Sequence, residues 1–137
     1  MTNLVHLLSG KIHRARVTSA DLDYEGSLTI PMTLMEAAGI AEYEAVHIWN
    51  VTSGNRIQTY AICGRENSKE ICANGAAAHL IKPEDKIIIA TFTWVDRELA
   101  KSLRPKIVLV DDENQITEVR AFELANNVPH TSQLTVS

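Results

Sequence analysis

Short runs with the two-residue alternation of β-strands, each closed by turn-forming residues, constrain the fold of this chain most strongly. Residues 45–51 alternate well, with Val46 and Ile48 on one side of the predicted strand. Residues 52–55 read Thr-Ser-Gly-Asn, a strong turn signal, and residues 56–63 resume a β-type pattern. The sequence therefore predicts a β-hairpin at the centre of the chain.

The same kind of pattern recurs along most of the chain. Only two short helices are indicated: one opens at Pro31 and ends at Gly39, and the other covers residues 96–103 and stops before Pro105. Many short strands and few helices predict one mainly β, barrel-like domain over residues 1–125, followed by a flexible polar tail at 126–137. The further predicted strands are 11–18, 87–94, 106–110 and 115–119, the last two forming a second hairpin around a charged loop.

Charge and aromatic content narrow the functional classes. Thirteen Lys and Arg against seventeen Asp and Glu give a net charge of −4, and aromatic residues make up only 5%. Such a chain lacks both the basic surface that attracts phosphates and the stacking platform that binds bases, so we expect no nucleic-acid partner.

The two cysteines and the N-terminal segment bear on the cellular compartment. No basic leader precedes a long apolar run, and no apolar stretch approaches the length of a membrane span, so we expect a cytoplasmic protein without a membrane partner. Cys63 and Cys72 are then expected as reduced, partly buried thiols. They lie nine residues apart without a second pair, and no histidine has ligand spacing, so no metal site is predicted.

The Gly26–Ser27 pair could undergo a specific self-cleavage reaction, although such pairs usually mark turns. Glycine has no Cβ, so its carbonyl can be approached closely. A Ser27 hydroxyl held against the Gly26 carbonyl could undergo an N-to-O acyl shift to an ester. β-Elimination would then cut the chain and leave a dehydroalanine, which hydrolyses to a pyruvoyl group with loss of ammonia.

Motifs on both sides of this pair give it a context. Upstream stands Gly-Lys-Ile-His-Arg at 10–14, and Tyr24 and Glu25 directly precede the pair. Downstream stand Ile-Trp-Asn-Val-Thr at 48–52, Gly-Asn-Arg at 54–56, Thr-Tyr-Ala-Ile at 59–62 and Asn-Gly-Ala-Ala-Ala-His at 74–79. In this order and spacing, from about residue 10 to 105, the chain resembles the pyruvoyl-dependent aspartate 1-decarboxylases.

The resemblance implies a fold, a reaction and an assembly. The fold would be a double-psi β-barrel with short helices, cleaved autocatalytically from a zymogen between Gly26 and Ser27 into a small chain 1–26 and a large chain beginning at residue 27. The enzyme would be a lyase that converts L-aspartate to β-alanine and CO2 for pantothenate and coenzyme A biosynthesis. It would act as a homotetramer with sites at subunit interfaces, and a helper protein could assist its maturation.

The resemblance also implies roles for individual residues. Ser27 would become the pyruvoyl group and form a Schiff base with the substrate amine, and Tyr60 would return a proton to Cα after decarboxylation. His13, Tyr24 and Asn74 would support the site. The implied substrate-binding residues are Lys11, Arg56, Thr59, Gly75, Ala76 and Ala77.

Each of these positions also has a structural interpretation. Tyr60 and Thr59 suit a β-strand on propensity alone, and Arg56 follows a turn. Lys11 could be a surface lysine, and residues 74–78 could simply start a helix. The alternative for the whole chain is an uncleaved or non-enzymatic small β-barrel that acts as a binding or assembly module.

Overall fold

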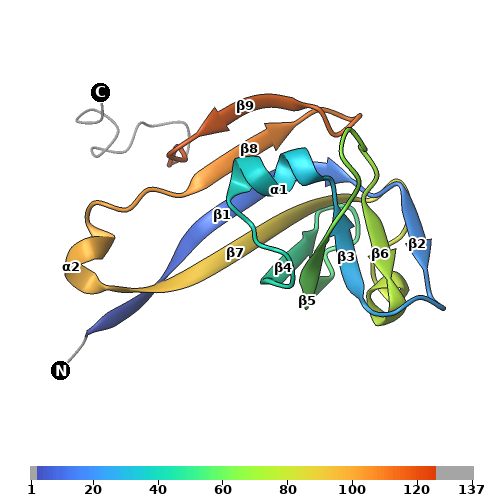
Figure 1. Cartoon of the computed structure of the whole chain (residues 1–137), viewed down its shortest axis with the longest axis horizontal. Coiled ribbons are helices and arrows are strands. Elements are labelled where there is room, and N and C mark those ends of the chain that lie inside the picture. Colours follow the sequence, from blue (N-terminus) through green and yellow to red (C-terminus); the bar gives the residue numbers. More distant parts are fainter. Residues whose placement is uncertain (1–2, 126–137) are drawn as a thin grey trace.

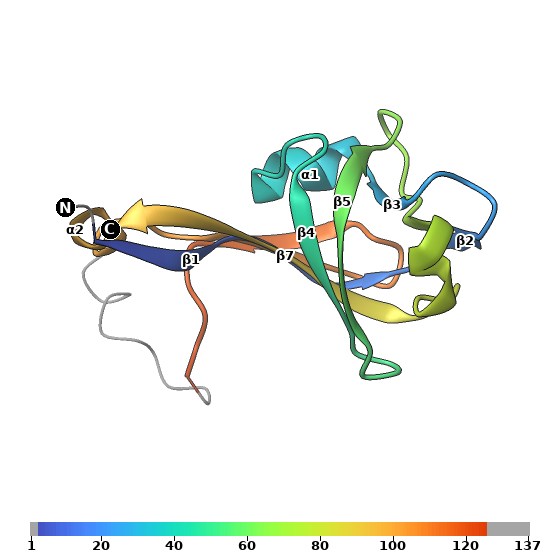
Figure 2. The same cartoon turned by 90° about the horizontal axis from the view of Figure 1, so that it is seen from below.

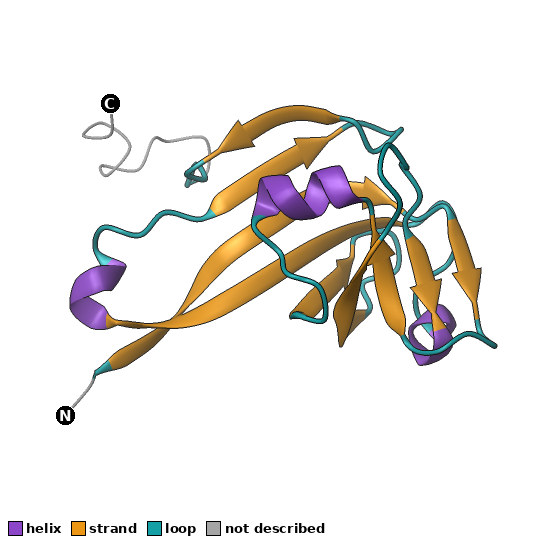
Figure 3. Cartoon of the chain, in the orientation of Figure 1, coloured by secondary structure: helices purple, strands orange, loops and turns teal. Residues whose placement is uncertain are grey.

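A computed structural model describes residues 3–125, which form a mainly β fold with short helices (Figures 1 and 3). The strands lie side by side in the order β2-β6-β3-β5-β4-β7-β1-β8-β9. The predicted fold class is confirmed, and the architecture is consistent with a small double-psi β-barrel. The predicted tail at 126–137 lies outside the described residues. The strands are β1 (Leu4–Arg16), β2 (Ser19–Asp21), β3 (Ser27–Ile30), β4 (Ala45–Asn50), β5 (Arg56–Cys63), β6 (Cys72–Asn74), β7 (Lys86–Asp96), β8 (Lys106–Val110) and β9 (Ile116–Arg120).

Both predicted hairpins form. β4 pairs antiparallel with β5 in a continuous register from Ala45 opposite Tyr60 to Trp49 opposite Arg56. β8 pairs antiparallel with β9. The alternation expected for β4 is present, because Val46 is fully buried and Trp49 on the other face is half-buried. The short-range pattern therefore predicted correctly which side of β4 faces the core.

The strand β1 starts earlier than the predicted 11–18, at Leu4, and ends at Arg16. It pairs with β7 from one end of that strand to the other, from Leu4 opposite Asp96 to Arg16 opposite Lys86. Figure 2 shows the ends of these two strands extending beyond the body of the fold as a long ribbon. Gly10 lies in β1 beneath the first helix. A Cβ at this position would lie 2.3 Å from the carbonyl oxygen of Ala38, so only glycine lets the strand pass so close to the helix.

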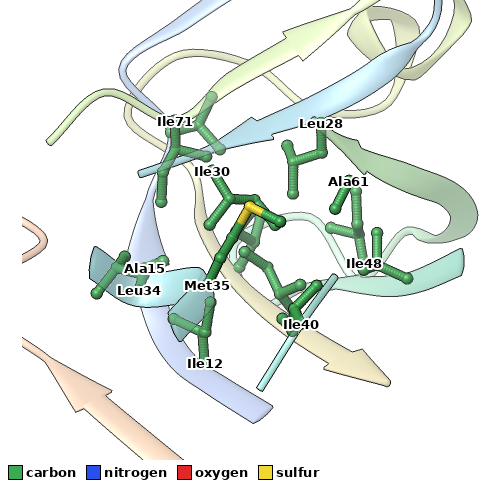
Figure 4. Close-up of a cluster of buried hydrophobic side chains, with 14 of the residues drawn as sticks. Ile12, Ala15, Leu28, Ile30, Leu34, Met35, Ile40, Ile48, Ala61 and Ile71 are labelled. Carbon is green, nitrogen blue, oxygen red and sulfur yellow. The ribbon is translucent and has the colours of Figure 1, made fainter. Parts of the chain in front are cut away.

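The first helix, α1 (Met32–Ala38), follows the prediction closely. Pro31 occupies the position before its first turn, and Gly39 ends it with a φ of 70°. The helix lies against β1 and β8 (Figure 1). Its apolar residues Leu34 and Met35 are buried in the core (Figure 4).

The second predicted helix is largely wrong. The predicted range 96–103 contains only a single turn, α2 (Arg97–Ala100), because Asp96 still belongs to β7. None of the α2 residues is buried, so no apolar face stabilises a longer helix. Residues 74–78 were expected either as a loop or as a helix start, and the segment Gly75–His79 forms a short 3-10 helix, η1.

The main core lies between α1 and the strands β1, β3, β4, β5 and β7 (Figure 4). Leu28 and Ile30 of β3 point into this core and are fully buried. Because side chains alternate along a strand, Ser27 and Thr29 point to the opposite face of β3. In the ladder with β6, Ser27 lies opposite Asn74 and Thr29 opposite Cys72, and these residues form one side of the candidate site.

Candidate functional site

The Gly26–Ser27 junction lies where an exposed loop enters the barrel. Residues 21–26 are exposed, whereas Ser27, the first residue of β3, is only 2% exposed. Ser27 has a φ of 145°, a positive value that non-glycine residues rarely adopt. Such backbone strain persists only where the surrounding structure imposes it, and it is concentrated at functional sites. The junction thus combines a buried hydroxyl, a strained backbone and a preceding glycine without a side chain.

The Ser27 hydroxyl is held by a buried amide. Asn74 Nδ2 donates to Ser27 Oγ at 3.1 Å and to Thr29 Oγ1 at 3.0 Å. Asn74 is 4% exposed, and it pairs directly with Ser27 across the antiparallel β3–β6 ladder. A buried amide that is fully hydrogen-bonded fixes the rotamers of its partners. Asn74 therefore orients the Ser27 side chain.

Gly75 brings the start of η1 against the junction. Its φ is 62°, and a Cβ here would lie 2.8 Å from Gly26 Cα, 2.9 Å from Gly26 N and 2.9 Å from the carbonyl oxygen of Tyr24. These are backbone atoms, which cannot move aside as a side-chain tip can. Any side chain at this position would therefore displace the segment that leads into Ser27.

A cavity of about 260 Å³ opens beside the junction. This volume lies just below the range of about 300–1,000 Å³ that is usual for ligand pockets, so the cavity suits a small metabolite rather than a large ligand. The Thr59 side chain offers a hydroxyl to this space, and Ala76 and Ala77 leave the start of η1 accessible because their side chains are small. The lining residues are Gly26, Ser27, Ile57, Gln58, Thr59, Ala76, Ala77 and Leu80.

Tyr60 lies on the other side of β5 from Thr59, since adjacent strand residues alternate. It is 38% exposed and borders a shallow hollow shared with Tyr43 and Ala45. Gln58 and Thr59 line both this hollow and the cavity at Ser27. The two spaces therefore adjoin along β5, although Tyr60 does not line the Ser27 cavity itself.

Lys11 lies on the outer face of the sheet. It pairs with Ala90, Ala90 pairs with His47, and His47 pairs with Gln58, so these four residues form one row across four strands. Three strand spacings of ~4.8 Å separate the ends of the row, about 14 Å, which exceeds the reach of a lysine side chain. Lys11 Nζ instead donates to Glu123 Oε2 at 2.6 Å.

Arg56 lies on this same face, because it is two residues from Gln58. Its guanidinium carbon is 5.5 Å from the centre of the Trp49 ring. Trp49 also belongs to a group of rings with His47 and Phe92. Within one chain the structure thus brings five of the predicted residues together around Ser27: Thr59, Asn74, Gly75, Ala76 and Ala77. The other predicted residues do not line this cavity: Lys11, His13, Tyr24, Arg56 and Tyr60.

His13 lies near Lys11, and its environment disfavours the charged form. Burial lowers the pKa of His13 below its ordinary value of 6.5, and the positive charges of Lys11, Arg14 and Arg120 lower it further, against an opposing effect of Glu123. Its Nδ1 atom is buried and has no hydrogen-bond partner among residues 3–125. The imidazole is therefore held neutral close to physiological pH.

Five residues of the site were not predicted as part of it: Thr29, Cys72, Gln58, Ile57 and Leu80. The alternation of strand residues was the available signal. Thr29 follows Ser27 by two positions, and Cys72 precedes Asn74 by two, so each shares a strand face with a predicted residue. Both cysteines are free and half-buried, as predicted.

Two kinds of site are not found in the described part of the chain. Residues 3–125 contain no group of three or more His, Cys, Asp or Glu side chains placed to hold a metal ion. Over the same residues, no helix has both the length and the apolar character needed to cross a membrane.

These features define the class: a small β-barrel protein with a buried, strained serine directly after an exposed glycine, beside a small and partly apolar cavity. Comparison with known proteins then identifies the family. The family model described as aspartate decarboxylase matches residues 3–117, and the chain belongs to this family.

Relatives from distant bacteria support the assignment. The chain is 53% identical over 113 residues to the aspartate 1-decarboxylase of Rhodopirellula baltica, which covers 82% of this chain and 72% of the relative. It is 50% identical over 125 residues to that of Legionella pneumophila strain Lens, covering 90% and 94%. It is 51% identical over 120 residues to that of Lactiplantibacillus plantarum, covering 88% and 92%.

Proposed function

We propose that this protein is a lyase that removes the α-carboxylate of L-aspartate as CO2 and releases β-alanine, the precursor of pantothenate and coenzyme A. Membership of the aspartate decarboxylase family supports the reaction class. The single observation that carries the proposal at this site is the buried Ser27, with a φ of 145° and a hydroxyl fixed by Asn74. The proposed location is the cytoplasm.

The proposed maturation uses only groups of the chain and water. Ser27 Oγ attacks the Gly26 carbonyl carbon, the Gly26–Ser27 C–N bond breaks, and the Ser27 nitrogen gains the proton that the hydroxyl loses. Loss of the Cα proton then expels the Gly26 carboxylate from Cβ and cuts the chain. The resulting dehydroalanine takes up one water and releases one ammonia. The products are a small chain 1–26 and a large chain from residue 27 that carries a pyruvoyl group.

The residues at the junction suit this chemistry. Gly26 carries no side chain that could hinder approach to its carbonyl, and the space where a Cβ would be is open. Thr59 lines the same cavity, and its hydroxyl is proposed to donate to the Gly26 carbonyl as negative charge develops there. The cavity is small and partly apolar, which would strengthen such a hydrogen bond.

A pyruvoyl group supplies a carbonyl that condenses with an amine and withdraws electrons from the bond to the leaving carboxylate. The chain's own residues would then bind and protonate the substrate. The backbone at Gly75, Ala76 and Ala77 is proposed to contact a substrate carboxylate, since no large side chain blocks it. The Tyr60 phenol, which has an O–H to donate, is proposed to return a proton to Cα.

Lys11 and Arg56 would supply permanent positive charge for the two carboxylates of aspartate. Since both lie on the outer face of their own chain, we propose that they serve the site of a neighbouring subunit in a homotetramer. The half-buried rings of Trp49, His47 and Phe92 on that face support an interface there, because they form an apolar patch between the two cations. His13 and Tyr24 are proposed to assist proton movement.

We further propose that residues 1–125 are one domain, cut internally at the Gly26–Ser27 junction. Ser27 and Asn74 would then remain side by side after cleavage, because β3 stays paired with both β5 and β6. A maturation helper protein is a possible partner in this scheme.

Denaturing intact-mass measurement together with an assay for β-alanine tests the proposal. The expected result is two chains, 1–26 and 27–137, with the larger one lighter by one ammonia than a serine-headed fragment. Ser27→Ala should abolish cleavage and β-alanine formation, whereas Ser53→Ala, at an exposed turn serine next to Gly54, should leave both unchanged. A cleaved and active Ser27→Ala protein would refute the proposal. An intact, inactive wild-type chain would favour the binding or assembly module.

A further inference from the structure

The Cys72 thiol is the first donor in a chain of two hydrogen bonds that runs through Asn74 to Ser27. Cys72 Sγ donates to Asn74 Oδ1 at 3.1 Å, and Asn74 Nδ2 donates onward to Ser27 Oγ and Thr29 Oγ1. The carbonyl oxygen of Ala73 is a more distant alternative acceptor for the thiol, at 4.0 Å. The single thiol proton is therefore assigned to the hydrogen bond with Asn74 Oδ1, the nearer acceptor.

This thiol is the group that decides which way the Asn74 amide faces. The hydroxyls of Ser27 and Thr29 can either donate or accept, so they accommodate the amide oxygen or the amide nitrogen equally. The Cys72 thiol is a weak donor, and because it donates to the amide oxygen it favours the oxygen on its own side. Both N–H groups of Asn74 then point at Ser27 and Thr29.

The orientation matters for the Ser27 hydroxyl. With an Asn74 N–H directed at it, Ser27 Oγ is held in place through a lone pair and its own proton is left free to leave. In the opposite orientation the amide oxygen would accept the Ser27 proton and turn the hydroxyl toward Asn74. The first arrangement suits attack on the Gly26 carbonyl, in which Oγ must lose that proton.

We propose that Cys72 is a positioning residue for self-cleavage, acting through the orientation of the Asn74 amide. This inference rests on the proposed maturation at Ser27. Cys72 does not line the cavity at the junction, so its effect is on the rate of cleavage and not on the chemistry of the junction.

Cys63 is a matched control in the same molecule. It is also free and half-buried, and it lies in β5, on the other side of β3 from β6. Its Sγ donates to the carbonyl oxygen of Gly64 at 3.5 Å, which has no link to Ser27. Replacing Cys63 removes one thiol from the barrel and leaves the hydrogen bonds from Cys72 through Asn74 to Ser27 in place.

The experiment follows cleavage from the moment of synthesis. Wild-type, Cys72→Ala, Cys72→Ser and Cys63→Ala full-length chains are made by cell-free translation with a labelled amino acid, and the uncut fraction is measured against time on denaturing gels. Loss of one neutral hydrogen bond should slow Cys72→Ala by about three- to tenfold. Cys72→Ser should restore cleavage to within about twofold of wild type, since a hydroxyl also donates to Asn74 Oδ1. Cys63→Ala should match wild type.

Thermal unfolding of the same four chains, each carrying Ser27→Ala, separates positioning from a general loss of structure. The expected result is equal midpoints for Cys72→Ala and Cys63→Ala. Cleavage of Cys72→Ala at the wild-type rate would overturn the inference, and so would a Cys72→Ser variant as slow as Cys72→Ala. A wild-type chain that never cleaves would instead refute the proposed maturation, and this inference with it.

Discussion

Replacing Gly75 by alanine should damage both the stability of the barrel and its cleavage. The φ of 62° at this position costs a non-glycine residue about 1–2 kcal/mol. The added Cβ would lie 2.8–2.9 Å from backbone atoms of Gly26 and Tyr24, and overpacking of this kind costs about 1–3 kcal/mol. Together, Gly75→Ala should lower the free energy of unfolding by about 2–5 kcal/mol, a large share of a typical domain's stability.

Gly54 provides the control, because it isolates the backbone contribution. Its φ is 83°, and a Cβ there would find nothing within 4 Å. Gly54→Ala should therefore cost only the backbone part, about 1–2 kcal/mol. The difference between the two variants in the free energy of unfolding measures the cost of the collision between the added Cβ and the backbone at the junction.

The assay is guanidinium denaturation of both variants on a Ser27→Ala background, so that a single uncut chain is compared throughout. Cleavage is then followed with Ser27 restored, where Gly75→Ala should be slowed and Gly54→Ala should not. Equal losses of stability in the two variants, or normal cleavage of Gly75→Ala, would refute the reasoning that Gly75 supports the Tyr24–Gly26 segment.

Three further predictions concern residues on the outer face of the sheet. Tyr60→Phe should cleave normally but lose about 10²-fold or more in kcat for β-alanine formation; unchanged turnover would remove Tyr60 as the proton donor. Arg56→Ala should cleave normally and raise KM for aspartate about 10- to 100-fold, through loss of a charged hydrogen bond; an unaltered KM would leave Arg56 only its contact with Trp49. His13 should make stability depend on pH: because burial lowers its pKa below 6.5, the unfolded chain binds more protons than the native one, and the free energy of unfolding should fall as pH drops through about 6.5. Denaturation at several pH values should show a weaker fall for His13→Gln, and identical slopes for the two proteins would contradict this origin.

Local patterns in the sequence determined the elements of the fold. The alternation around Val46 and Ile48 predicted β4 and its buried face, and the turn at 52–55 predicted its hairpin partner. The end of α1 at Gly39 was equally predictable, since glycine readily adopts the left-handed conformation found there. These features depend on residues close in sequence, so their physical causes are contained in short segments.

The predicted second helix failed because its fate depended on tertiary contacts. The residues 97–100 can form a helical turn, but whether a longer helix persists depends on an apolar surface that could cover it. Asp96, the first residue of the segment, is the last residue of strand β7, and none of the residues of α2 is buried against the β1–β7 ribbon. Propensity over eight residues carried no information about either fact.

For the site, the sequence by itself determined the reactive pair and, through its motifs, the family. Only the tertiary structure decided that Ser27 is buried with a strained backbone and that Asn74, 47 positions away, holds its hydroxyl. It also separated Lys11 from Ser27 by placing it at the far end of a row across four strands. The reason is strand order: alternation tells which face a side chain occupies, but the packing of the whole barrel decides which strands become neighbours.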